Sequence, residues 1–145
     1  MYTATVLVQV VSFVPASSGG TIKALMGPPT DTSPGAPTGV FSGTGKKIVV
    51  TVPAGYTGSV QLTLQLPDPN YCLLGVAGAS ANGGVGRTEF PSVVIFRDSY
   101  GSQLTVVDEC LPEFDNATFS YDILIQQVTT GQFGYIDPDE ENVPS

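Results

Sequence analysis

Apolar and polar residues alternate with a period of two in several short stretches of the chain, a pattern that predicts β-strands with one buried face. The clearest stretch is residues 60–66, where Val and Leu alternate with Gln and Thr before a Pro-Asp-Pro-Asn turn. Residues 47–52 and 71–76 are further strands. The even positions from Tyr2 to Val10 are apolar or aromatic and lack a basic segment before them, which favours a strand over a signal peptide.

Two hairpins are expected in the second half of the chain. Residues 92–97 and 103–107 flank Asp98-Ser99-Tyr100-Gly101, whose leading Asp and closing Gly suit a type I turn. Alternation over residues 119–126, followed by Thr-Thr-Gly, predicts a second hairpin with residues 132–136. Weaker strand candidates are residues 21–26 and 40–41.

The remaining segments are expected to be loops. Residues 27–45 are rich in Pro, Gly, Ser and Thr and are interpreted as a long surface loop. The glycine-rich stretch that runs on to Gly86 lacks the Gly-Lys-Ser/Thr ending of a phosphate loop, so a loose loop is the expectation. The acidic segment after residue 136 contains two prolines and is expected to dock on the domain rather than fray.

No window of eleven residues has helical periodicity, and Gly and Pro together make up 29 of the 145 residues. This composition is typical of many short strands joined by turns. The predicted fold is all-β, a single domain over residues 1–145 built as an antiparallel β-sandwich of jelly-roll or immunoglobulin-like type, with seven to nine strands.

Charge is distributed unevenly along the chain. Residues 98–145 carry ten acids and no base, whereas residues 1–97 hold all five bases and three acids, so the two parts have net charges of −10 and +2. The total of −8 argues against nucleic acid or an anionic membrane as a partner. No segment reaches the length of a membrane span, and a soluble, cytoplasmic protein is expected.

The absence of histidine restricts the chemistry. A serine nucleophile has no imidazole base, and the spacing of the lysines gives no support to a Ser–Lys pair. A hydrolase that uses paired carboxylates is a third, weaker hypothesis, which Asp108→Asn would test. We therefore expect no enzyme activity and no cofactor, apart from calcium.

Calcium is the metal that an oxygen-only ligand set suits, because Ca²⁺ takes six to eight oxygen ligands in flexible geometry. Acids gather around residues 108–115 and after residue 136, although neither group follows a calcium-loop pattern, and solvated surface acids are the simpler interpretation. The weak calcium candidates are Asp108, Glu109, Glu113, Asp115, Asp137 and Asp139.

Cysteine and tyrosine leave two questions open. Cys72 and Cys110 are the only cysteines, and two reduced thiols are favoured over a disulfide. Tyr56, Tyr71 and Tyr100 lie at predicted turns, where they either stack on a sugar or close the ends of the sandwich.

Short motifs in the second half carry a resemblance. They are Phe90-Pro91-Ser92-Val93-Val94-Ile95-Phe96-Arg97-Asp98, Leu104-Thr105-Val106-Val107-Asp108, Phe119-Ser120-Tyr121-Asp122-Ile123-Leu124, and Gly134-Tyr135-Ile136-Asp137-Pro138 with Asn142. Over residues 58–144 the chain resembles the bacterial DP-EP family of unknown function and is similar to inclusion-body proteins of the AidA/PixA type. Glu140 stands where that pattern has an apolar residue. The resemblance implies a β-sandwich and transfers no catalytic residue.

Together these observations favour a non-enzymatic bacterial protein that acts by self-association or by interaction with a protein, as inclusion or assembly proteins do. Its partner would be a second copy of the chain or another protein, because sandwich edges pair readily when few charges guard them. The alternative is a sugar- or peptide-binding module assisted by calcium.

Overall fold

Strands dominate the computed structural model, which describes residues 1–33, 40–44, 47–81, 84–85, 92–96, 103–108, 118–136 and 139–144. These ranges contain thirteen strands and one short 3₁₀ helix, η1. The elements are β1 (Tyr2–Ser12), η1 (Ala16–Ser18), β2 (Lys23–Met26), β3 (Thr30–Asp31), β4 (Phe41–Thr44), β5 (Lys47–Val52), β6 (Val60–Gln65), β7 (Tyr71–Ala81), β8 (Gly84–Val85), β9 (Ser92–Phe96), β10 (Gln103–Asp108), β11 (Thr118–Gln127), β12 (Phe133–Ile136) and β13 (Asp139–Pro144).

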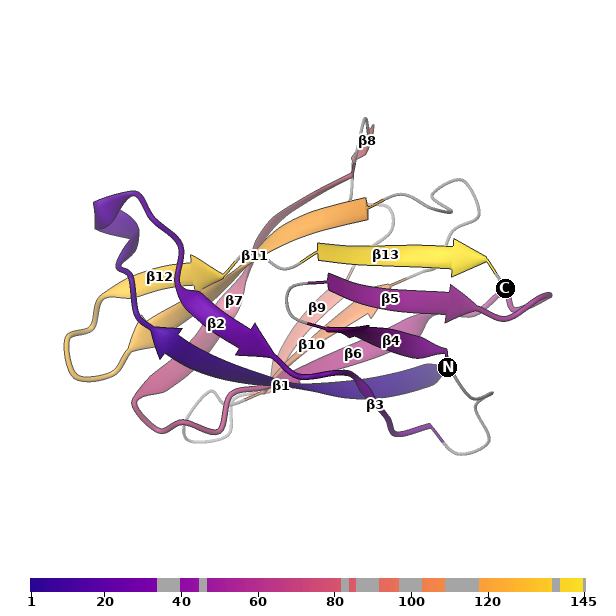
Figure 1. Cartoon of the computed structure of the whole chain (residues 1–145), viewed down its shortest axis with the longest axis horizontal. Coiled ribbons are helices and arrows are strands. Elements are labelled where there is room, and N and C mark those ends of the chain that lie inside the picture. The colour runs from indigo at the N-terminus through magenta and orange to yellow at the C-terminus, as the bar shows by residue number, and fades with distance from the viewer. Residues whose placement is uncertain are drawn as a thin grey trace.

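The strands form two sheets (Figure 1). In the described part of the chain, the first sheet has six strands in the order β2-β1-β6-β10-β9, with β3 also paired to β1. The second has seven, in the order β4-β5-β13-β11-β7-β8, with β12 also paired to β11. Both sheets contribute buried side chains to one hydrophobic core. The all-β fold expected from the sequence is therefore confirmed.

The core follows from the alternation in the sequence. In β6, Val60, Leu62 and Leu64 are buried, and the Gln and Thr residues between them are partly exposed. In β1, the even positions from Ala4 to Val8 are buried in the same way. Leu73 of β7 and the isoleucines of β11 and β12 supply the opposite side of the core. Burial of such side chains, worth about 1.5–3 kcal/mol each, is what drives the two sheets together.

Two strand pairs are parallel, which a purely antiparallel sandwich does not allow. β1 runs parallel to β6, with Tyr2 opposite Val60, and β13 runs parallel to β5, with Asp139 opposite Lys47. Both hairpins predicted from the sequence are present as the antiparallel pairs β9–β10 and β11–β12. The turn at residues 98–101 lies outside the described residues.

The described ranges hold more strands than the seven to nine predicted. Residues 27–45 were expected to be a loop but contain β3 and β4, and the glycine-rich stretch after Gly75 continues β7 to Ala81 and adds β8. β3 and the extension of β7 are held by β1 and β11, which are distant in the sequence, so local composition did not indicate them. β4 and β8 pair with the adjacent strands β5 and β7, and β4 overlaps the weaker strand candidate at residues 40–41. The short η1 is likewise an element that the periodicity did not indicate.

The acidic C-terminal segment docks on the domain, as expected, and does so as an interior strand. β13 lies between β5 and β11, with Glu141 opposite Val49 on one side and Thr118 on the other. Pro138, which was expected to end the last strand, lies outside the described residues. The chain therefore returns to the sheet after β12 and joins two strands that are distant in the sequence.

Threonines form a row across the outer face of the six-stranded sheet. Thr30 of β3 is opposite Thr5 of β1, and Thr5 is opposite Thr63 of β6. Thr63 is in turn opposite Thr105 of β10, and their hydroxyl oxygens lie 3.0 Å apart. Because Thr105 is only 1% exposed, this bond satisfies a buried hydroxyl.

One end of the sandwich is closed by a close approach between the β1–β2 connection and β12. The backbone N–H of Ile22 donates to the carbonyl oxygen of Tyr135 at 2.8 Å. A Cβ on Gly134 would collide with the carbonyl oxygen of Val14 and would lie 3.1 Å from side-chain atoms of Ile22. Only glycine therefore fits at this position of β12.

Candidate functional site

The structure places two of the six calcium candidates, and it puts them in different sheets. Asp108 is the last residue of β10, opposite Val60, and is completely buried. The calcium hypothesis placed Asp108 in a surface loop. The Asp108 side chain instead lies on the core-facing side of its strand. Asp139 begins β13 in the other sheet. Glu109, Glu113, Asp115 and Asp137 lie outside the described residues.

A metal site is not formed by the part of the chain that can be described. Within it, no three His, Cys, Asp or Glu side chains come together to hold an ion. In the same ranges, no helix is long and apolar enough to cross a membrane.

Tyr56 and Tyr71, which were both predicted to lie at turns, pack against the core, and Tyr71 is the first residue of β7. The Tyr56 ring stacks on Tyr2 with their centroids 4.5 Å apart, and its hydroxyl donates to the Ser59 carbonyl oxygen at 2.6 Å. The Tyr71 ring stacks on Phe13 with a centroid separation of 5.8 Å. These contacts support the end-closing role and not a sugar platform for both residues. Tyr100 lies outside the described residues.

Cys72 is a free, partly buried thiol, so the reduced state favoured by the sequence is confirmed for this residue. Its Sγ lies 3.7 Å from the side-chain oxygen of Gln126 on the neighbouring strand β11. Cys110 lies outside the described residues.

The exposed apolar side chains of the described residues gather on β1, β2 and the β11–β12 hairpin. Of the large apolar residues with exposed side chains in the described ranges, Met1 is at the N-terminus, and the other five lie in β1, β2 and the β11–β12 hairpin. These five side chains are 50–59% exposed. They are Leu7, Val11, Leu25, Val128 and Phe133. Figure 1 shows β2, η1 and β12 together at one end and both termini at the other.

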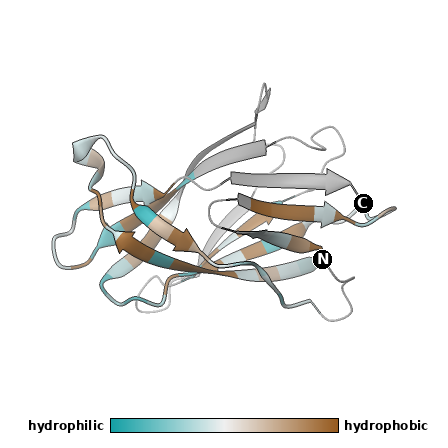
Figure 2. Ribbon diagram, in the orientation of Figure 1, coloured by the Kyte–Doolittle hydropathy of each residue, from teal (hydrophilic) through white to brown (hydrophobic). Residues whose placement is uncertain are grey.

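Strand register places Leu7 and Leu25 on one face. Leu25 is opposite Gln9, so Leu7 is its diagonal neighbour on β1, whereas Val11 is exposed at the register shift between Val10 and Ser12. Before that shift, odd-numbered residues of β1 face outward because Ala4, Val6 and Val8 enter the core. Figure 2 shows that β1 and β2 are rich in hydrophobic residues, which supply both this face and the core. Several exposed aliphatic side chains on one face mark an interaction surface more strongly than single exposed ones do.

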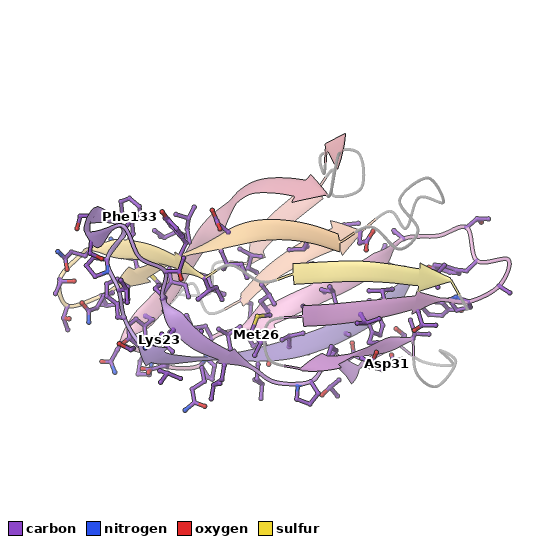
Figure 3. All side chains as sticks on the ribbon, turned by 45° about the horizontal axis from the view of Figure 1, so that its top comes forward. Lys23, Met26, Asp31 and Phe133 are labelled. Carbon is purple, nitrogen blue, oxygen red and sulfur yellow. The ribbon has the colours of Figure 1, made fainter. Side chains whose placement is uncertain are left out.

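An open groove of about 590 Å³ lies between η1 and the β11–β12 turn. Pro15, Ala16 and Ser17 form one wall, and Gly131, Gln132 and Phe133 form the other. The walls come from the β1–β2 connection and the β11–β12 turn, which the bond between Ile22 and Tyr135 holds together. The half-exposed ring of Phe133 lines this groove. Figure 3 labels Phe133 at the same end of the molecule as Lys23.

The segments that build this end are almost uncharged. Residues 1–30 contain Lys23 as their only charged residue, and residues 123–136 contain none. The chain has five bases and thirteen acids, so an even distribution would put about five charges in these 44 residues. We call the end formed by residues 7–12 of β1, by β2, by their connection and by the β11–β12 hairpin the weakly charged end.

Sequence reasoning did not identify this surface. The uncharged runs were visible in the sequence, but nothing local indicated that residues 1–30 and 123–136 meet. The contact depends on long-range pairing of the connection before β2 with β12.

No protein-family model matches the chain, and no curated protein matches its sequence.

Proposed function

We propose that this chain is a non-enzymatic β-sandwich protein that acts by self-association or by contact with a protein partner, as inclusion and assembly proteins do. The observation that carries the proposal is the weakly charged end, where five large apolar side chains are at least half exposed. Water contact with such a surface is unfavourable, so covering it with protein stabilises an assembly.

Two further observations support the proposal. Residues 58–144 resemble the DP-EP and AidA/PixA-type proteins, the second of which form inclusions. The chain also has no histidine, which removes the commonest general base of hydrolytic enzymes. A cytoplasmic location belongs to the same proposal, and the free Cys72 thiol supports it, since reducing compartments keep thiols free.

Light scattering over a wide range of protein concentration tests this function. A mass that rises above the 15.0 kDa of one chain as concentration increases supports self-association. A mass of 15.0 kDa at every concentration, with and without calcium, contradicts self-association. A rise that occurs only with calcium assigns assembly to the acidic residues instead of the weakly charged end.

A second candidate function is a sugar- or peptide-binding module. The groove beside Phe133 favours it, because a half-exposed aromatic ring next to the Gln132 side chain offers both a stacking surface and a hydrogen-bonding amide. A ligand that binds only the folded state raises the melting temperature by mass action. Thermal scans against oligosaccharides and short peptides, with and without calcium, therefore test this alternative, and an unchanged melting temperature throughout contradicts it.

A further inference from the structure

We infer that the weakly charged end binds the same end of a second copy about a two-fold axis, which gives a closed dimer. This inference rests on the proposed function and specifies the occupant and the geometry of the contact. An isologous contact uses one surface twice, so it is satisfied at two copies and leaves no site for a third.

The charge distribution selects a second copy as the occupant. A basic partner would be attracted to the ten acids within residues 98–122 and 137–145, and not to an end with one lysine. A partner that fits the weakly charged end must itself present an apolar surface with little charge. A second copy of the chain meets this condition.

Charge also selects the orientation of the two copies. Each carries a net charge of −8, so two copies repel one another when their acidic parts approach. The acidic strand β13 lies in the half of the molecule that holds both termini (Figure 1). Contact through the opposite end keeps the β13 strands of the two copies apart. Screening over about 8 Å at physiological ionic strength then weakens the remaining repulsion.

The surface offers both a protruding group and a recess. Phe133 and the aliphatic residues of β1 and β2 protrude, and the groove between η1 and the β11–β12 turn is a recess that an apolar side chain of the second copy can enter. Aromatic residues next to a pocket are the usual anchors of protein interfaces. Lys23 and Phe133 lie at the same end of the molecule, far from Asp31 near the other end (Figure 3).

Sedimentation equilibrium of the full chain and of three variants tests the inference. Phe133→Asp and Val11→Asp each put a charge into the proposed contact and should weaken the dimer at least 10-fold. Thr57→Asp is the matched control, because it adds the same charge at an exposed position of the β5–β6 connection, outside the weakly charged end. The dissociation constant of its dimer should equal that of the wild-type dimer, and higher salt should lower both dissociation constants. Equal urea midpoints for all variants exclude unfolding as the cause.

Each contrary outcome has a distinct meaning. If the mass of the wild-type chain rises with concentration and the masses of Phe133→Asp and Val11→Asp rise equally, self-association stands and the proposed surface is wrong. An average mass that rises above the mass of two chains as concentration increases overturns the two-fold geometry. A wild-type chain that stays at 15.0 kDa rejects self-association as a whole.

Discussion

Replacing Gly134 by alanine should strongly destabilise the fold, because β12 passes too close to the β1–β2 connection for any side chain. The new methyl group would collide with the backbone carbonyl oxygen of Val14 and crowd Ile22, whose side-chain atoms would be 3.1 Å away. The rotation of a side chain cannot relieve a clash with backbone. One of the two segments must therefore move.

The magnitude follows from the two contacts that the movement affects. Overpacking of a tightly packed site costs about 1–3 kcal/mol, and weakening the bond between Ile22 and Tyr135 adds about 0.5–1.5 kcal/mol. We therefore expect Gly134→Ala to lower the free energy of unfolding by about 2–4 kcal/mol.

Gly27→Ala is the matched control. A Cβ there would lie 3.8 Å from the nearest atom, the carbonyl oxygen of Leu7, which is ordinary contact. Both substitutions restrict the unfolded chain to a similar extent, about 0.4–1 kcal/mol, so the difference between the two variants isolates the clash. Urea unfolding monitored by circular dichroism measures both. Unfolding free energies within about 0.5 kcal/mol of each other would refute the close approach.

Three further substitutions test the packing, again by urea unfolding. Leu62→Ala removes a completely buried side chain and should cost about 2–5 kcal/mol, whereas Leu25→Ala at the surface should cost less than about 0.5 kcal/mol; similar costs would contradict the assigned core. Thr63→Val leaves the buried Thr105 hydroxyl without its 3.0 Å partner and should cost about 1–3 kcal/mol, and adding Thr105→Val should recover most of that loss; strictly additive costs would argue against the bond. Tyr56→Phe removes the hydrogen bond to Ser59 but keeps the ring stacked on Tyr2, so a loss of about 0.5–1.5 kcal/mol is expected, and no loss would mean that the hydroxyl is equally stable in water.

The alternation of apolar and polar residues predicted strands correctly where one face of the strand is buried and the other is exposed to solvent. Residues 47–52 coincide with β5, and the alternation of β6 matches its burial residue by residue. Both hairpins were predictable for the same reason, since their pairing is local and the turn residues lie between the strands. The even positions of β1 likewise face the core, as expected.

Long-range pairing limited the prediction. Nothing in the composition of residues 77–81 indicates a strand, and β7 continues through them because β11 pairs with it along its length. The parallel pairs β1–β6 and β5–β13 depend on how distant segments meet, which the alternation of a single segment does not encode. The same limit concealed the weakly charged end, which exists only once η1 and the β11–β12 turn are side by side. It also misplaced Asp108, a carboxylate that looks like a loop residue in sequence but ends a buried strand.

The position of β13 has a consequence for synthesis of the protein. β5 and β11 stay apart until residues 139–144 have left the ribosome and entered between them, so the second sheet cannot be completed before these residues have been synthesised. Until then, each of these strands presents an unpaired edge that a neighbouring nascent chain can occupy. Premature termination before β13 should therefore yield a product that aggregates rather than a smaller stable domain.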